Sequence, residues 1–420
     1  MRRYLSIDFL RGLGIFFVVL LHQLVFHYSN IVEAIENPNI IVIIVGFLLE
    51  FGGLFVIISS IAHTVTNYGR LRDNTQSLRN VLISSIVYGL FFLIMNYIYF
   101  LVFAPGLLDR EVGEFRMSII PALIRKGVFV PPDIDRYFHA TILGIIGWSI
   151  IFVNIALFFM FRKNGLQKVK RNIMIMLFLG TFFTVAGLSR IYLYPIFNGL
   201  IDNSNYFSAI FLGFLVNNYY PIFPYLGFAF YGSMIGLAIV HDEYKKYYWK
   251  FFFILGFFWL ILGVVGYISF EDTMLERAVD MHAVSFEVLM LGIFILTFQL
   301  LFKLIDQNGA NVSPKKEKTT RFFRRFGVVS FTIFMFETTF SELIGKLFSL
   351  VWGGWNTQMW SCFIFSFTNL ILWTIIIFLW EKAEFKYGLE WMTGKFLYLI
   401  VKRPSTKIYL KQILYFEGEK

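Results

Sequence analysis

The first apolar stretch of the chain, residues 6–27, combines the length of a membrane span with ionisable side chains. A helix over residues 8–28 would rise about 30 Å, the thickness of the hydrocarbon core of a bilayer. On this helix Arg11 and His22 would point within roughly 20° of one direction, about 16 Å apart along the axis. Because ionisable groups are costly to expose to lipid, this face is expected to line protein or water. It is therefore the first candidate for a site.

The residue types on this face suggest two tasks. An Arg guanidinium can donate two parallel hydrogen bonds to a phosphate or carboxylate, and a His can remove a proton near neutral pH. Asp8 lies three residues before Arg11 and can pair with it. A cation near the inner edge and a base about 16 Å outward fit a phosphate-bearing carrier with a long flexible arm. Acyl-coenzyme A has that shape, and Arg11 with Asp8 would bind its phosphate end.

Other ionisable residues lie in or beside later apolar stretches. Glu50 lies at a depth comparable to that of His22 and could orient the imidazole, as in a His–acid pair. Glu337 lies near the middle of the ninth stretch, where a carboxylate is expected to line the same cavity. His27 and Arg190 lie near outer span ends, where they would bind an acceptor. Each of these side chains could instead have a purely structural role, as a hydrogen-bond partner inside the bundle or an anchor at the membrane interface.

The elements that position these residues are membrane helices. The chain has 420 residues, 58% of them hydrophobic and only 15% charged, against about 25% charged in soluble domains. The +10 net charge lies in short loops between apolar stretches, which indicates topology rather than nucleic-acid binding. The one cysteine, Cys362, allows no intramolecular disulfide and hints at no metal site. Ten stretches are long enough to span, at residues 8–28, 40–66, 79–104, 139–161, 172–194, 221–240, 249–270, 283–304, 326–351 and 359–381.

The loops predict how these spans are oriented. Basic residues alternate from loop to loop as the positive-inside rule requires, which places both termini in the cytoplasm. Residues 105–138 are expected to form an external cap with short helices, and residues 206–216 are too short to span. We expect an all-α bundle of about ten transmembrane helices over residues 1–383. The tail 384–420 is expected to be an amphipathic helix on the cytoplasmic leaflet.

Four motifs carry a resemblance to known proteins. D-F-L-R-G-L-G-I-F-F-V-V-L-L-H (residues 8–22) resembles the opening of two related groups of transmembrane acyltransferases, one of them the acyltransferase-three family, whose mark is Arg, ten intervening residues and then His. The other three resemble the heparan-α-glucosaminide N-acetyltransferase-like group of transmembrane acyltransferases. They are I-L-G-I-I-G-W-S (142–149), Y-P-I-F-P-Y-L-G-F-A-F-Y-G-S-M-I-G (220–236) and G-V-V-S-F-T-I-F-M-F-E (327–337).

The chain departs from that group at two places. Gly144 and Glu337 stand where relatives often have His. His139, five residues before Gly144, is a candidate substitute and is assigned to substrate binding. In some heparan-type members the base lies after the first span, and His27 is nearest to that place.

The resemblance implies transfer of an acyl group, most often acetyl, from cytoplasmic acyl-CoA to a sugar amine or hydroxyl at the outer face. His22 would take the acceptor's proton with Glu50 or Glu337 holding its ring. Arg11, Arg70 and Arg72 would hold the CoA phosphates. No metal is expected, and the partners would be the bilayer, acyl-CoA and a glycan or glycolipid, in a plasma membrane and as a monomer or homodimer. The alternatives are an O-acyltransferase of polysaccharide or lipid, and a non-enzymatic transporter or scaffold.

Overall fold

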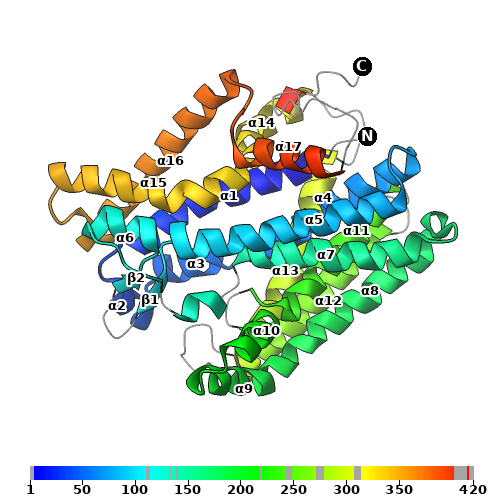
Figure 1. The fold of residues 1–420 in the computed structure, drawn as a ribbon, viewed down its shortest axis with the longest axis horizontal. Coiled ribbons are helices and arrows are strands. Elements are labelled where there is room, and N and C mark those ends of the chain that lie inside the picture. Colours follow the sequence, from blue (N-terminus) through cyan, green and yellow to red (C-terminus); the bar gives the residue numbers. More distant parts are fainter. Residues whose placement is uncertain are drawn as a thin grey trace. The chain divides into compact units, whose positions relative to one another are not determined.

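The computed structural model describes residues 4–109, 114–132, 134–138, 141–217, 220–241, 248–270, 279–306, 314–401 and 414–415. Within these ranges the chain is almost entirely helical (Figure 1), apart from one short antiparallel hairpin of β1 (Leu107–Asp109) and β2 (Glu114–Arg116). Nine helical segments of the described chain are long and apolar enough to cross a membrane, or ten if one bent pair counts as a single span. The predicted all-α polytopic membrane fold is confirmed.

The long apolar helices follow the predicted spans closely. They are α1 (Leu5–His27), α3 (Ile40–Leu49) with α4 (Gly52–Arg72), α5 (Leu78–Ile98) with η1 (Tyr99–Phe103), α7 (Ile142–Phe161), α8 (Val169–Ala186) with α9 (Arg190–Asp202), α11 (Ile222–Val240), α12 (Tyr248–Ser269), α13 (Met281–Asp306), α14 (Pro314–Val328) with α15 (Ser330–Val351), and α16 (Met359–Lys382). The shorter helices are α2 (Ile31–Glu36), α6 (Ile119–Lys126), η2 (Ile134–Phe138), η3 (Gly165–Gln167), η4 (Gly187–Ser189), α10 (Tyr206–Val216), η6 (Trp355–Thr357) and α17 (Leu389–Val401).

The chain forms two compact units. The first contains Met1–Ile7, Gly52–Asn96 and Tyr137–Val312, and the second contains Asp8–Phe51, Tyr97–Arg136 and Ser313–Lys420. The second unit therefore joins the first span to the last two and to the cap segment, which are distant in sequence.

In the first unit, α11 is buried along nearly its whole length and packs against α4, α7 and α8. Glycines permit this approach, because a Cβ on Gly232 would lie 2.5 Å from the carbonyl oxygen of Ile57 in α4. Such close backbone contact through small residues is typical of membrane helix pairs.

In the second unit, α14 and α15 form a broken span that bends by 67°. The sequence predicts one span over residues 326–351, and the structure instead ends α14 at Val328 and restarts the helix at Ser330. The cap segment contains the short helices that were expected, α6 and η2, and α6 packs on α15 and η1. Residues 206–216 form the short helix α10, as predicted.

Candidate functional site

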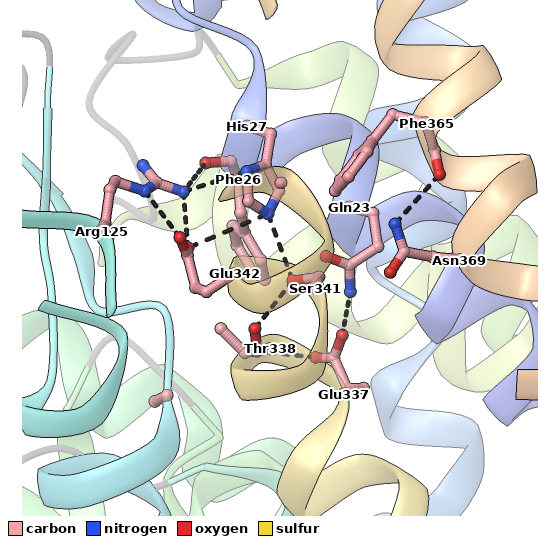
Figure 2. Close-up of polar contacts among 12 residues, drawn as sticks. Gln23, Phe26, His27, Arg125, Glu337, Thr338, Ser341, Glu342, Phe365 and Asn369 are labelled. Carbon is pink, nitrogen blue, oxygen red and sulfur yellow. Dashed lines mark hydrogen bonds and ion pairs between the residues drawn. The ribbon is translucent and has the colours of Figure 1, made fainter. Parts of the chain in front are cut away.

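A polar seam joins α1 to α15 within the second unit. Gly12 of α1 lies against Gly327 of α14, His22 contacts Glu337, and His27 contacts Ser341. The partners differ by 314 or 315 residues at each point, so the two helices run parallel in a fixed register. Parallel packing is what the alternating topology requires of the first and ninth spans. The polar residues recur at helical spacing on both helices and meet along this seam (Figure 2).

One part of the seam is a His–carboxylate pair. His22 Nδ1 lies 2.8 Å from Glu337 Oε1. The fully buried Glu337 also accepts hydrogen bonds from Gln23 Nε2 and from Thr338 Oγ1, the latter at 3.0 Å. A carboxylate can only accept, so Nδ1 of His22 is the donor and carries a hydrogen. Three donors around one buried carboxylate compensate the cost of removing it from water.

The part of the seam nearer the C terminus of α1 contains a second histidine, His27. Arg125 of α6 forms a two-pronged ion pair with Glu342, at 2.6 and 2.8 Å, and its Nη2 lies 3.1 Å from His27 Nδ1. A guanidinium can only donate, so Nδ1 of His27 accepts and its Nε2–H donates to Ser341 Oγ at 3.2 Å. The Ser341 hydroxyl in turn donates a hydrogen bond to the Thr338 carbonyl.

The two histidines therefore differ in what they can do. Both ring nitrogens of His27 are taken, and its ring is buried between Trp355 and Phe365. His22 uses only Nδ1, and its side chain is 19% exposed. No hydrogen bond to its Nε2 is found in the part of the chain that the structure describes. His22 is thus the histidine that can accept a proton, with Glu337 orienting its ring.

Arg11 lies on the same stripe of α1 as His22. Residues 11, 14, 18, 22 and 25 recur at helical spacing and are all half-buried, whereas residues 12, 15, 19 and 23 on the other side are buried. Between the Arg and the His, this stripe carries only Gly14 and Val18, so α1 itself places no bulky side chain there. Arg11 makes no hydrogen bond or ion pair with another described residue, and the predicted Asp8–Arg11 pair is absent.

The other predicted site residues are placed as follows. Glu50 caps the C terminus of α3, half-buried, and the carboxylate that contacts His22 is Glu337. Of the two carboxylates expected to hold the imidazole, Glu50 or Glu337, it is therefore Glu337 that contacts it. Arg70 and Arg72 lie at the end of α4 in the first unit, where they bond to Asn67 and Asp73.

Arg190 is occupied by the protein itself. Its guanidinium pairs with Glu287 at 2.6 and 2.8 Å and donates to the carbonyls of Val216 and Asn217. This buried network joins α9, α10 and α13, and the substrate role of Arg190 stays a prediction. His139 lies outside the described residues.

Sequence reasoning missed Gln23, Arg125, Thr338, Ser341 and Glu342. A signal was present, because residues 337, 338, 341 and 342 are polar and recur at the spacing of one helix face. The partner of that face could not be found from the sequence, since Arg125 comes from α6, more than 200 residues away. Among the described residues, no group of three or more His, Cys, Asp or Glu could hold a metal ion.

Comparison with known proteins adds no assignment. No protein-family model and no curated protein matches the chain. The resemblance to transmembrane acyltransferases therefore depends on the four sequence motifs alone.

Proposed function

We propose that this chain is a transmembrane acyltransferase of a plasma membrane, which moves an acyl group, acetyl in the simplest case, from acyl-CoA to a sugar amine or hydroxyl. The observation that carries the proposal is the His22–Glu337 pair, with Nδ1 of the imidazole bound to a buried carboxylate and Nε2 left to act as a base. This arrangement suits proton removal from a weak nucleophile near neutral pH.

The reaction would be a direct transfer. The acceptor's oxygen or nitrogen attacks the thioester carbonyl carbon while His22 Nε2 takes its proton. The carbon–sulfur bond then breaks, and the proton passes from His22 to the CoA thiolate. Cys362 is buried and contacts Asn356, so it is poorly placed to form an acyl-enzyme.

Arg11 would bind the phosphates of the carrier. It lies about 16 Å along α1 from His22 on the same half-buried stripe, and no described partner neutralises it. That separation suits the pantetheine arm between the phosphates and the thioester of CoA.

Equilibrium binding of acetyl-CoA to detergent-purified protein tests the proposal. We expect saturable binding that weakens by about tenfold or more in Arg11→Ala, because a charge-assisted hydrogen bond contributes ~1.5–3 kcal/mol. Lys346→Ala is the control, since the bond that the described part of the chain offers this exposed lysine is with the Ile124 carbonyl of α6. A transporter or scaffold would leave acetyl-CoA unbound, and that result would refute the proposal.

A further inference from the structure

Helix α17 is tied closely to the end of a membrane span. Only six residues separate it from α16, and they fold back on that helix: Phe385 is fully buried, and Trp380 Nε1 donates to the Lys386 carbonyl at 2.7 Å. Since α16 is a candidate span, this short connection keeps the start of α17 within about 25 Å of the membrane boundary.

Helix α17 has one buried face and one exposed apolar face. Thr393 and Leu397 are buried against the protein. Met392, Phe396 and Leu399 lie at i, i+4 and i+7 and are 54%, 44% and 74% exposed. A helix of thirteen residues is too short to span, so this face is not explained by a transmembrane path. An apolar face of this kind on a helix held beside a bilayer suits the headgroup–acyl boundary.

The buried side of α17 reaches the N terminus of α15. Glu390 Oε1 accepts hydrogen bonds from the backbone N–H groups of Phe331 and Thr332, at 2.6 and 3.2 Å. Its Oε2 accepts from Thr332 Oγ1 at 2.6 Å, and Thr332 Oγ1 in turn accepts from the Leu389 N–H. The first N–H groups of a helix have no partner within the helix, and a negative charge is favourable there. Glu390 therefore supplies from another helix the cap that α15 needs after the 67° break.

We propose that α17 is a membrane-contact helix that inserts Met392, Phe396 and Leu399 into the interfacial region of the bilayer, and that this docking holds Glu390 on the N terminus of α15. The partner is the lipid surface itself. Its recognition is apolar rather than electrostatic, because the charged side chains of α17 are one acid, which is used as the cap, and Lys395, which lies over the Trp391 ring. This inference holds whether or not the chain transfers acyl groups.

The lipid contact is tested with an environment-sensitive fluorophore on single cysteines. In a Cys362→Ala background, Leu399→Cys and Tyr398→Cys are labelled in protein reconstituted into phosphatidylcholine liposomes. The two positions lie about 100° apart around the helix. Because Tyr398 is 44% exposed on the flank of the helix, we expect brominated phosphatidylcholine to quench the label at Leu399 more strongly than the label at Tyr398, with no change when anionic lipid is added. Equal quenching at both positions overturns the proposal. So does a shielded Leu399 label that brominated lipid does not reach, because another protein surface would then cover the face.

The link to α15 is tested by hydrogen exchange of the 330–334 segment in the same liposomes. We expect loss of amide protection at Phe331 and Thr332 in Glu390→Ala, and also in a Phe396→Gln/Leu399→Gln double variant that weakens docking. Glu384→Ala is the matched control, since its half-exposed carboxylate pairs, among the described residues, with Lys386 alone. Unchanged protection in the double variant would overturn the coupling.

Discussion

The hydrogen-bond partners of each imidazole distinguish the two histidines, of which the sequence predicts His22 as the base and His27 as an acceptor-binding residue. Arg125 forces Nδ1 of His27 to accept, which fixes the hydrogen on Nε2 and occupies both nitrogens. Glu337 forces Nδ1 of His22 to donate, which leaves Nε2 for chemistry. The distinction follows from the chemistry of the partners, since guanidinium cannot accept and carboxylate cannot donate. It favours His22 as the base in the proposed reaction, and acceptor binding by His27 stays a prediction.

Glu337→Gln tests the role of the carboxylate. We expect acyl transfer to slow by about 10²- to 10⁴-fold, because an amide orients the ring but does not stabilise the imidazolium that forms on proton transfer. Acetyl-CoA binding should stay near the wild-type value. The measurement is the steady-state rate with Glu384→Gln, a change at a half-exposed carboxylate, as the control. A rate equal to wild type would show that Glu337 has no part in the reaction.

At the scale of elements, the seam includes a close backbone approach of α1 to α14. A Cβ on Gly12 would lie 1.7 Å from the carbonyl oxygen of Phe323, so this crossing cannot accept a side chain without moving. Because the same register sets His22 against Glu337, a shift of one helix along the other would separate the pair.

Gly12→Ala is therefore expected to destabilise the second unit by ~1–3 kcal/mol, the usual cost of overpacking. The control is Gly46→Ala in α3, where a Cβ would meet nothing within 4 Å and helix propensity should add ~0.5–1 kcal/mol. Thermal unfolding in detergent compares the two variants. Equal midpoints would mean that the crossing is looser than the structure shows.

The contribution of Glu390, which caps the N terminus of α15, to the stability of the fold depends on pH. Burial raises the pKa of Glu390 above its ordinary value of 4.5, while its hydrogen bonds with Thr332 and Phe331 oppose this shift. A carboxyl group with a raised folded-state pKa contributes most to stability below pH 4.5, and this contribution is lost as the pH rises through the folded-state pKa.

The substitution Glu390→Gln removes the ionisable carboxyl group and with it this pH dependence of stability. We expect the stability of the variant relative to wild type to rise as the pH increases from 4.5 through the folded-state pKa, and to level off above it. Unfolding midpoints measured over this pH range provide the comparison. A difference that is constant with pH would contradict the raised pKa.

At the scale of the whole molecule, loop charge and span length predicted the helical segments well, because hydrocarbon thickness and backbone hydrogen bonding leave few alternatives. They could not predict the breaks. The first turn of the helix that restarts at Ser330 donates hydrogen bonds to Glu390, sixty residues further along the chain. The division into two units was likewise not predictable, since contacts between distant segments define it.

The sequence predicted some of the residues of the candidate site but not how they pair. Ionisable residues inside apolar stretches are conspicuous in a sequence, which is why His22 and Glu337 were both selected. Their pairing depends on the register of two helices separated by 315 residues. Comparable depth alone favoured Glu50 as well, and depth does not determine which helices are neighbours.

The charges of the loops predict on which side of the membrane each loop of the chain lies. In a Cys362→Ala background, a cysteine at Lys126, an exposed residue of the cap, should react with a membrane-impermeant maleimide added outside intact cells. A cysteine at Arg72, at the opposite end of its span, should react only after permeabilisation. The reverse pattern would invert the topology and place the base at the wrong surface for an external acceptor.

The central claim is tested most directly by His22→Ala. The measurement is the release of free CoA thiol from acetyl-CoA by purified protein supplied with a membrane glycan fraction, with acetyl-CoA binding measured on the same samples. We predict that the variant binds acetyl-CoA as wild type does but releases thiol at least about 10²-fold more slowly, because it lacks the base. Undiminished thiol release by His22→Ala would contradict the account.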